Sequence, residues 1–567
     1  MIKRIKSLLP AVLLAGLFSA CQSSGGSTQA PETTAETVAA PTSPATPPAT
    51  LTTESFGKYL REVSADELEG RKPFTSGEKK TLAYLEREFK ALGLEPGNGN
   101  SFLQEVPMVD VKTTASPTMT IKGKQTFKLE GRKDYVIWTR RTDPTVKLEP
   151  SELVFAGFGI VAPEYNWNDY AGLNVKDKVV VVLVNDPGFY APEGTGFKGK
   201  TMTYYGRWTY KFEEAARQGA RGCLIIHSTE PAGYGFEVVQ NNWNTSKLYL
   251  DSRGKETYKC AMEGWLSNEV GQKLLAAAGK DYATLVASAA KPGSKPVPLN
   301  MKVSTSMTVK TKYDKSHNFI AKITGFKAPD ESIIYTAHWD HLGYGKADAT
   351  GDSIYNGAVD DASGVAGLLE IAKAFKNQPT PPERSIVFLA VTAEEQGLWG
   401  SAYYAENPVF PKEKTVANIN MDMLNSYGRT KDIVLFGMGQ SELEDYMAEE
   451  ARKVGRYVAP EPNPEAGLYY RSDHFNFAKI GIPALFIGPG IDDVEKGKEY
   501  GKQQLDAFYA NYYHKPSDEV HEGYVMEGAV EDLTLLFQVG KRLSATGAWP
   551  KWKAGSEFKA VREAYLK

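Results

Sequence analysis

The chain has 567 residues, of which 42% are hydrophobic and 24% are charged, and its formal net charge is -3 at pH 7. This length exceeds what one hydrophobic core usually supports, so we expect two or three domains. The composition is that of a folded protein. No excess of Lys and Arg is present to neutralise phosphates, so we expect no nucleic-acid partner.

The first 21 residues have the pattern of a bacterial export signal. Three basic residues precede an apolar run at 8–18, which is too short to span a membrane. Two small residues and Cys21 follow this run, which resembles a lipoprotein signal, although an ordinary cleaved signal peptide is the alternative. Residues 22–50, rich in Ala, Pro, Thr and Ser, are predicted to be a disordered tether. We therefore expect an exported lipoprotein, periplasmic or outer-membrane associated, that contacts the membrane through a lipid on Cys21.

Residues 51–145 are predicted to form the N-terminal part of a catalytic domain. Apolar residues between 56 and 94 have helical spacing, and Gly93 stands at a C-cap position. From there to about residue 145 polar and apolar residues alternate, which is typical of antiparallel strands. Two helices followed by strands are therefore expected.

Residues 146–295 differ in pattern from the segments on either side. Asp169-Tyr170 precedes a valine run at 178–184, and a predicted helix ends at about residue 218 before an apolar strand at 222–226. This order resembles the protease-associated domain, so a mainly β insert is expected. The segment has no cluster of metal ligands. We expect it to shape a cleft or to bind the distal part of a substrate, and a purely structural insert is the alternative.

Strands and helices alternate in residues 296–567. This pattern predicts an α/β fold with a mostly parallel central sheet and helices on both faces. The predicted strands are 333–337, 386–392, 416–421 and 482–487, and the predicted helices are 364–375 and 530–543. We assign the catalytic chemistry to this part of the chain.

Candidate metal ligands gather at the ends of these predicted strands and in nearby loops. They are His338, Asp360, Glu394, Glu395, Asp422 and His514. Open α/β sheets place their sites at the carboxyl ends of the strands, so we expect these side chains to converge. Two histidines with several carboxylates predict a divalent-metal site, for which zinc is the natural occupant.

The number of carboxylates indicates two metal ions. One catalytic zinc needs three protein ligands and an open position, whereas five ligands with one bridging carboxylate supply three to each of two ions. Glu394, beside the ligand Glu395, would then accept a proton from the metal-bound water. Taken alone, Asp360 has a plainer explanation as a helix N-cap, and the two glutamates as a solvated turn. The ordered set favours the metal site.

The order of these motifs resembles that of the dizinc exopeptidases of metallopeptidase family twenty-eight. The motifs are His338-Trp339-Asp340, Asp360-Asp361-Ala362-Ser363-Gly364, Glu394-Glu395, Asn420-Met421-Asp422-Met423, Ser472-Asp473-His474 and Tyr513-His514. They cover residues 317–545, and the segment 68–71 and the insert extend the resemblance over nearly all of the mature chain. The family includes bacterial leucine-type aminopeptidases and glutamate carboxypeptidases.

The resemblance implies a set of ligands for two Zn2+ ions. Asp360 would bridge the ions, Glu395 and His514 would complete one site, and His338 and Asp422 would complete the other. His341 is an alternative to His338. Zinc-bound hydroxide would be the nucleophile, with Glu394 as the general acid and base.

The resemblance also implies roles for four neighbours of the ligands. Asp340 would orient His338 through its second ring nitrogen. Asp473 would form hydrogen bonds near the ligands without binding a metal ion itself. Tyr513 would donate a hydrogen bond to the tetrahedral intermediate, and Arg471 would lie at the substrate pocket.

The activity that these residues predict is that of an aminopeptidase acting on peptides with a free N-terminus. Three alternatives stay open: a carboxypeptidase, a glutaminyl cyclase-like enzyme on the same fold, and a non-catalytic receptor-like protein. A carboxypeptidase would need basic residues for a terminal carboxylate, of which Arg471 is one candidate. A cyclase usually works with a single zinc, and a receptor would not need the complete ligand set.

Overall fold

The structure is a computed structural model that describes residues 51–191, 193–255 and 257–566. The predicted signal segment, the tether and the lipidation site at Cys21 lie outside these residues. The described residues cluster into a single unit. Among them, no helix combines the length and the apolar character that a bilayer crossing requires.

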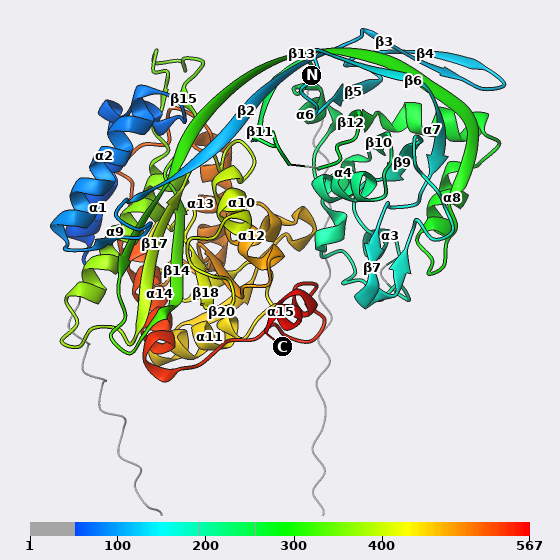
Figure 1. Ribbon diagram of the computed structural model, residues 1–567. Helices are drawn as coiled ribbons and strands as arrows, with labels where there is room; N and C mark the ends of the chain where they lie inside the picture. The colour runs from blue at the N-terminus through cyan, green and yellow to red at the C-terminus, as the bar shows by residue number, and fades with distance from the viewer. Residues whose placement is uncertain (1–50, 192, 256, 567) are drawn as a thin grey trace, which may run out of the picture. The chain divides into compact units, whose positions relative to one another are not determined.

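The central sheet of the C-terminal part is mostly parallel, as predicted (Figure 1). Four strands run parallel in the order β17 (Arg384–Val391), β14 (Ala328–His338), β18 (Thr415–Asn420) and β21 (Ala484–Gly488). At the edges, β13 (Val297–Ile323) pairs antiparallel with β17, and β19 (Asp432–Leu435) pairs antiparallel with β21 and parallel with β20 (Tyr457–Pro460). Strands β17 and β18 are buried along their whole length, as expected for a sheet covered on both faces.

Helices cover both faces of this sheet, which confirms the predicted fold class. Tyr335 of β14 lies in a core shared with α9 (Ser363–Lys376) and α14 (Glu527–Thr546). The residue before it in β14, Ile334, lies in a second core with residues of α10 (Trp399–Glu406) and α12 (His474–Lys479). Successive side chains of a strand point to opposite faces, so the two cores lie on opposite sides of β14.

The two predicted N-terminal helices are α1 (Thr53–Val63) and α2 (Ser76–Ala91). Each begins at a threonine N-cap: the Thr52 side chain accepts from the Ser55 N–H, and the Thr75 side chain accepts from the Gly77 N–H. The short helix η1 (Asp66–Arg71) connects them. The apolar faces of α1 and α2 join the same core as α9.

The long strand β13 connects the central sheet with the strands of the insert. It runs antiparallel to β2 (Leu103–Ala115) over thirteen residue pairs, and both appear as long neighbouring strands in Figure 1. Its first half pairs with β6 (Thr145–Phe155) and β3 (Thr118–Lys122). This strand begins at Val297, directly after the predicted boundary at residue 296, and takes part in the pairing of both regions.

The insert is α/β rather than mainly β, which corrects the prediction. Its core strands β6, β9 (Val179–Leu183), β10 (Gly222–Ile226) and β12 (Met262–Leu266) run parallel. Parallel neighbours need crossover connections, and these contain α4 (Trp208–Arg217) and shorter helices. The other helices of the insert include α3 (Pro187–Tyr190), η3 (Tyr204–Gly206), α7 (Asn268–Ala277) and α8 (Tyr282–Ala289). The likeness to the protease-associated domain stays a prediction.

Candidate metal centre

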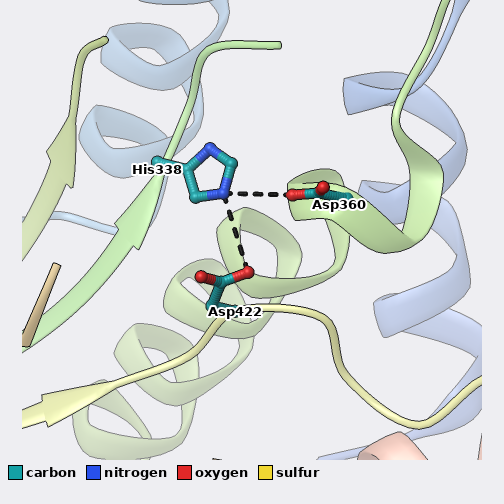
Figure 2. Close-up of side chains that lie close together, drawn as sticks. All are labelled: His338, Asp360 and Asp422. Carbon is teal, nitrogen blue, oxygen red and sulfur yellow. Dashed lines mark ion pairs between the residues drawn. The ribbon is translucent and has the colours of Figure 1, made fainter. Parts of the chain in front are cut away.

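His338, the last residue of β14, faces two carboxylates. Its Nε2 lies 3.2 Å from Oδ1 of Asp360 and 3.7 Å from Oδ1 of Asp422. Figure 2 shows the imidazole between the two acids. Asp422 follows β18, and Asp360 lies in η4 (Ala358–Ala362), directly before α9. Ligand atoms of the three buried residues lie close enough together to hold one metal ion.

A second group of donors shares Asp360. His341, Asp360 and Glu395 also place one ligand atom each within reach of a common ion. His341 Nδ1 lies 2.6 Å from Glu395 Oε1. His514 Nε2 lies 3.2 Å from Oδ2 of Asp360 and 3.2 Å from Oε2 of Glu395. Asp360 therefore stands between two sets of nitrogen and oxygen donors, with His338 and His514 on different oxygens.

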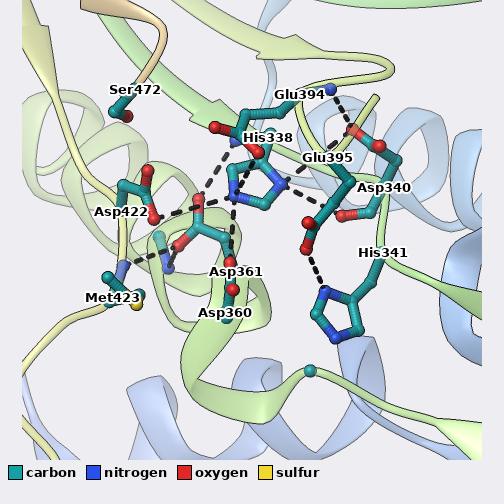
Figure 3. Close-up of polar contacts among 12 residues, drawn as sticks. His338, Asp340, His341, Asp360, Asp361, Glu394, Glu395, Asp422, Met423 and Ser472 are labelled. Atoms are coloured by element: carbon teal, nitrogen blue, oxygen red, sulfur yellow. Dashed lines mark hydrogen bonds and ion pairs between the residues drawn. The ribbon is translucent and has the colours of Figure 1, made fainter. Parts of the chain in front are cut away.

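His341 is not the substitute for His338 that the sequence left open. Its ring faces Glu395, as Figure 3 shows, and it belongs to the donor group of Asp360 and Glu395. The centre therefore contains three histidines. Sequence spacing could indicate that His341 lies near the site, but it could not indicate which carboxylate the ring faces.

The donor atoms at this centre fit a metal. Among the described residues, His341 Nε2 is buried without a hydrogen-bond partner, and His338 Nε2, His341 Nδ1 and Glu395 Oε1 are buried with other atoms of the centre as their polar neighbours. Buried polar atoms are nearly always hydrogen-bonded, so donor atoms that converge in this way need a common partner. Imidazole nitrogens with carboxylate oxygens are the ligand set of zinc.

Glu394 lies beside the ligands. Its Oε2 is 4.0 Å from His338 Nε2, and its backbone N–H donates to Oδ1 of Asp340 at 3.0 Å. Burial, together with the negative charges of Asp422 and Glu395, raises the pKa of Glu394 well above its usual range, although His338 opposes this. A carboxyl with a raised pKa can both take and return a proton near neutral pH.

Asp340 supports two site residues, but not in the predicted way. The Nδ1 atom of His338 is 3.0 Å from the backbone carbonyl oxygen of Asp340, whereas the Asp340 carboxylate is 3.9 Å away. That carboxylate instead accepts the Glu394 N–H. The main chain therefore orients the histidine, because the sharp turn after β14 brings the carbonyl closer than the side chain.

Two further aspartates fix the loops that carry the ligands. Oδ2 of Asp361 accepts from the His338 N–H at 3.1 Å, and Oδ1 accepts from the Met423 N–H at 3.3 Å. Asp518 accepts from the Val359 and Asp360 N–H groups, at 2.9 and 3.2 Å. The motif around Asp360 already contained Asp361, but no sequence signal distinguished Asp518.

Asp473 and Tyr513 lie close to the centre without joining either donor group. Asp473 is buried and accepts from the Ser401 hydroxyl at 2.5 Å, and burial raises its pKa to about 7. The Tyr513 ring stacks on the His514 ring at 3.8 Å. Burial and the carboxylates of the centre raise the pKa of Tyr513, so its phenol remains a hydrogen-bond donor.

Three residues of the site adopt the left-handed backbone conformation that non-glycine residues rarely take. They are Ala393, which precedes Glu394, Met423, which follows Asp422, and His514 itself, with φ values of 53°, 58° and 55°. Such conformations cost free energy and persist where surrounding contacts hold them. The turns that carry the ligands are thus strained at defined positions.

Arg471 is exposed, and its Nη2 donates to the Ala466 carbonyl at 2.8 Å. It directly precedes Ser472, whose hydroxyl accepts from the Asn420 amide at 2.7 Å. Arg471 is therefore the sequence neighbour of Ser472, but it is not part of either donor group.

Two groups of histidine and carboxylate donors that share one aspartate, at the carboxyl edge of a parallel α/β sheet, define the class of metal-dependent hydrolases. Residues 318–534 match the model of peptidase family M28. Over this segment, less than half of its length, the chain is similar to that peptidase family.

The chain is also similar to individual proteins. Over 216 residues the chain is 37% identical to a probable zinc metalloprotease of Pyrenophora tritici-repentis, covering 34% of this chain and 49% of that protein. It is 35% identical over 248 residues to aminopeptidase NAALADL1 of Mus musculus, covering 41% of this chain and 30% of that one. The chain thus spans about half the length, or less, of these curated relatives. A solved aminopeptidase from Aneurinibacillus sp. strain AM-1 is 20% identical, with a TM-score of 0.46 over 90% of this chain and 96% of that one.

Proposed function

We propose that this protein is a dizinc aminopeptidase that removes N-terminal residues from peptides. The observation that carries the proposal is the sharing of Asp360 between two donor groups, one with His338 and Asp422 and one with Glu395 and a histidine. One shared carboxylate between two such groups is what a pair of ions with a common water requires.

In this proposal His338 and Asp422 would hold one zinc ion, Glu395 and His514 would hold the other, and Asp360 would contribute to both. When bound, the ions act as Lewis acids that lower the pKa of a water molecule and polarise the peptide carbonyl. Glu394 takes the proton of the attacking water and returns it to the departing amine. Its raised pKa and its distance of 4.0 Å from His338 Nε2 support this role.

Two features of the centre favour a peptide substrate that has a free amino group and an apolar N-terminal residue. The many carboxylates of the centre can hold a free α-ammonium group by charge. An apolar recess opens beside Asp422, with Met423, Phe436, Leu505 and Phe508 among its lining residues. The phenol of Tyr513 is proposed to donate to the oxyanion that forms at the carbonyl.

The proposal includes export and attachment to a membrane through a lipid on Cys21. The support is the N-terminal sequence, with its basic start, short apolar run and terminal cysteine. We expect the wild-type protein to be released from membranes only by detergent, and the Cys21→Ser variant to be released without detergent. Equal solubility of both forms would refute the anchor.

The activity is tested with purified protein by measuring metal content and hydrolysis on the same sample. We expect about two zinc ions per chain, hydrolysis of aminoacyl chromogenic amides, and loss of that hydrolysis when the amino group is acetylated. Equal rates on free and acetylated substrates would refute the aminopeptidase assignment. A content of one zinc per chain would refute the shared-aspartate centre.

A further inference from the structure

A second cavity lies against α13 (Gly497–Asn511), on another face of this helix from the apolar recess. Leu505 and Tyr509 line the recess, whereas Gln504, Ala507 and Asn511 line the cavity. Residues three or four apart share one face of a helix, so the two sets of side chains point in different directions. The helix therefore stands between the two spaces.

The cavity adjoins the recess, but none of the proposed metal ligands lines it. The residues that border both spaces are Val359, Ser426, Tyr427 and Phe508, whereas Asp422 borders the recess only. The cavity has a volume of about 150 Å³. A cavity of this size can hold an organic molecule as large as benzene.

The charged side chains of the cavity are acidic. Asp518 and Glu519 line it, and among the described residues around it none is Lys or Arg. Asp518 is 1% exposed, and its two oxygens accept from the Val359 and Asp360 N–H groups at 2.9 and 3.2 Å. Each carboxylate oxygen can accept a further hydrogen bond, so Asp518 can still accept from a ligand. Glu519 is exposed, so the cavity opens to solvent on its side.

Tyr524 contributes a phenol oxygen that has no partner. The side chain is 8% exposed, and its hydroxyl is buried without a hydrogen-bond partner among the described residues. Buried hydroxyls are nearly always hydrogen-bonded. Because Tyr524 and Asp518 line the same small cavity, one group with several N–H donors could satisfy both.

Aromatic rings form much of the remaining wall. The ring of Tyr512 lies 5.2 Å from that of His521 and 6.3 Å from that of Phe508, and the His521 ring lies 6.4 Å from that of Tyr524. The faces of such rings attract cations, and their carbon atoms pack against alkyl chains. An acidic and aromatic wall is complementary to an organic cation and unfavourable for an anion.

We propose that this cavity binds a primary alkylammonium ion. The ammonium group donates to the Tyr524 oxygen and to the Asp518 carboxylate, and the alkyl chain packs against the rings of Phe508 and Tyr512. An organic cation fits better than a metal ion, because the acids of this cavity belong to neither group of described residues that could hold a metal. The inference does not depend on the proposed peptidase function, since binding is measured directly.

The test measures the binding of n-butylamine to the purified protein by calorimetry at pH 8, where the amine is protonated. Butan-1-ol has nearly the same shape without the charge. We expect a Kd of about 1 mM or lower for the amine, and binding at least about tenfold weaker for the alcohol. No binding of the amine at about 10 mM, or equal binding of the alcohol, would overturn the proposal.

Two variants locate the bound amine. Ala507→Leu fills part of the cavity from α13, and Tyr524→Phe removes the phenol oxygen without a partner. We expect each to weaken the binding of n-butylamine at least about tenfold. Ala510→Leu, at an exposed position of the same helix, is the matched control and should bind as wild type does.

The variants also distinguish this cavity from the metal centre. An amine held at the metal centre would bind to Ala507→Leu and Tyr524→Phe with the wild-type Kd, and that result would overturn the second site. If Ala507→Leu has a lower Tm than wild type, Tyr524→Phe decides the question, because it removes a single oxygen atom from the side chain.

Discussion

Glu394 and Glu395 are neighbours in the chain, but their surroundings move their pKa values in opposite directions. Burial and Asp360 would raise the pKa of Glu395, yet His341 and His514 outweigh them and hold it at about 2. Burial and nearby carboxylates raise that of Glu394. One carboxyl is therefore suited to remain an anionic ligand and the other to exchange a proton.

Changing Glu394 to glutamine should separate proton transfer from metal binding. The amide keeps the shape of the side chain but cannot take a proton, so we expect kcat to fall by about 10³-fold while zinc content stays at the wild-type value. Zinc analysis and turnover on an aminoacyl amide measure both. Glu395→Gln is the matched comparison and should lose metal. An unchanged kcat for Glu394→Gln would exclude it as the base.

Removing the His341 ring should weaken metal binding on the Glu395 side of Asp360. The imidazole lies 2.6 Å from Glu395, and loss of such a supporting contact typically costs about 10- to 100-fold in metal affinity. Competition with a chromogenic chelator should show that His341→Ala releases one ion more readily than wild type. His474→Ala, which empties an equally buried site beside Phe486, is the control. Equal release from both variants would contradict the role.

At the scale of elements, η1 holds the turn after β14 and the loop before η4. Its last residue, Arg71, is buried and donates to the Trp339 carbonyl at 2.9 Å and to the Gly357 carbonyl at 3.0 Å. It also donates to the carbonyls of Val63 and Asn356. One guanidinium therefore ties the first helix to both loops that carry His338 and Asp360.

Arg71→Met should destabilise the fold and loosen the metal centre together. Several buried carbonyls would lose their donor, which costs about 3 kcal/mol or more. Thermal unfolding should show a lower Tm than wild type, and a lower chelator concentration should suffice to remove the metal. Arg87→Met, which changes an exposed arginine paired with Glu88, should leave both unchanged. A wild-type Tm for Arg71→Met would refute this role.

The loop after β20 carries a buried carboxyl, Glu461, whose titration should affect stability. Burial raises its pKa from the usual 4.5 to about 7, although the carboxylate accepts a hydrogen bond from the Gly437 N–H. The folded state therefore binds the proton more tightly than the unfolded state. Its contribution is fully present below about pH 4.5 and is lost as the pH rises to about 7.

Glu461→Gln should remove this pH dependence. We expect the Tm of the variant minus that of wild type to be larger at pH 8 than at pH 5. The change corresponds to at most about 3 kcal/mol in the free energy of unfolding. Melting curves of both proteins at the two pH values measure the difference. Glu499→Gln, at an exposed position of α13 (Gly497–Asn511), is the control. The same difference at both pH values would contradict the prediction.

The elements were predictable where local pattern decides them. Buried apolar runs gave the positions of β14, β17 and β18, and the motifs at their ends gave the ligands that follow them. The helical crossovers of the insert were underestimated because its valine-rich strands dominate the pattern. The length of β13 was not predicted, because many of its residues are exposed and because it pairs with five different strands along its length.

Long-range contacts of single side chains could not be predicted. Arg71 reaches the Trp339 carbonyl across 268 residues, and Asp518 reaches Asp360 across 158 residues. No spacing rule connects such residues, because the topology of the sheet decides which loops become neighbours.

At the scale of the whole molecule, Glu557 joins the C-terminal segment, the insert and the loop that carries Arg471. This buried carboxylate lies 3.5 Å from Lys198 Nζ and accepts from the Tyr470 hydroxyl at 2.7 Å. It also accepts from the Tyr204 N–H at 3.3 Å. A single acid thus links both sides of the contact between the insert and the peptidase domain.

Glu557→Gln should loosen that contact without changing the central sheet. The amide loses the charge that faces Lys198, and its NH2 group replaces one of two accepting oxygens, which costs about 3 kcal/mol for a buried charged contact. Hydrogen exchange measured by mass spectrometry should become faster in segments 202–207 and 464–471, while β14 and β17 keep wild-type protection. Glu563→Gln, which breaks the exposed pair with Lys559, is the control and should change neither segment. Faster exchange throughout the sheet would mean that Glu557 stabilises the entire fold, and wild-type exchange in both segments would mean that the aromatic contacts of Tyr204 hold the insert on their own.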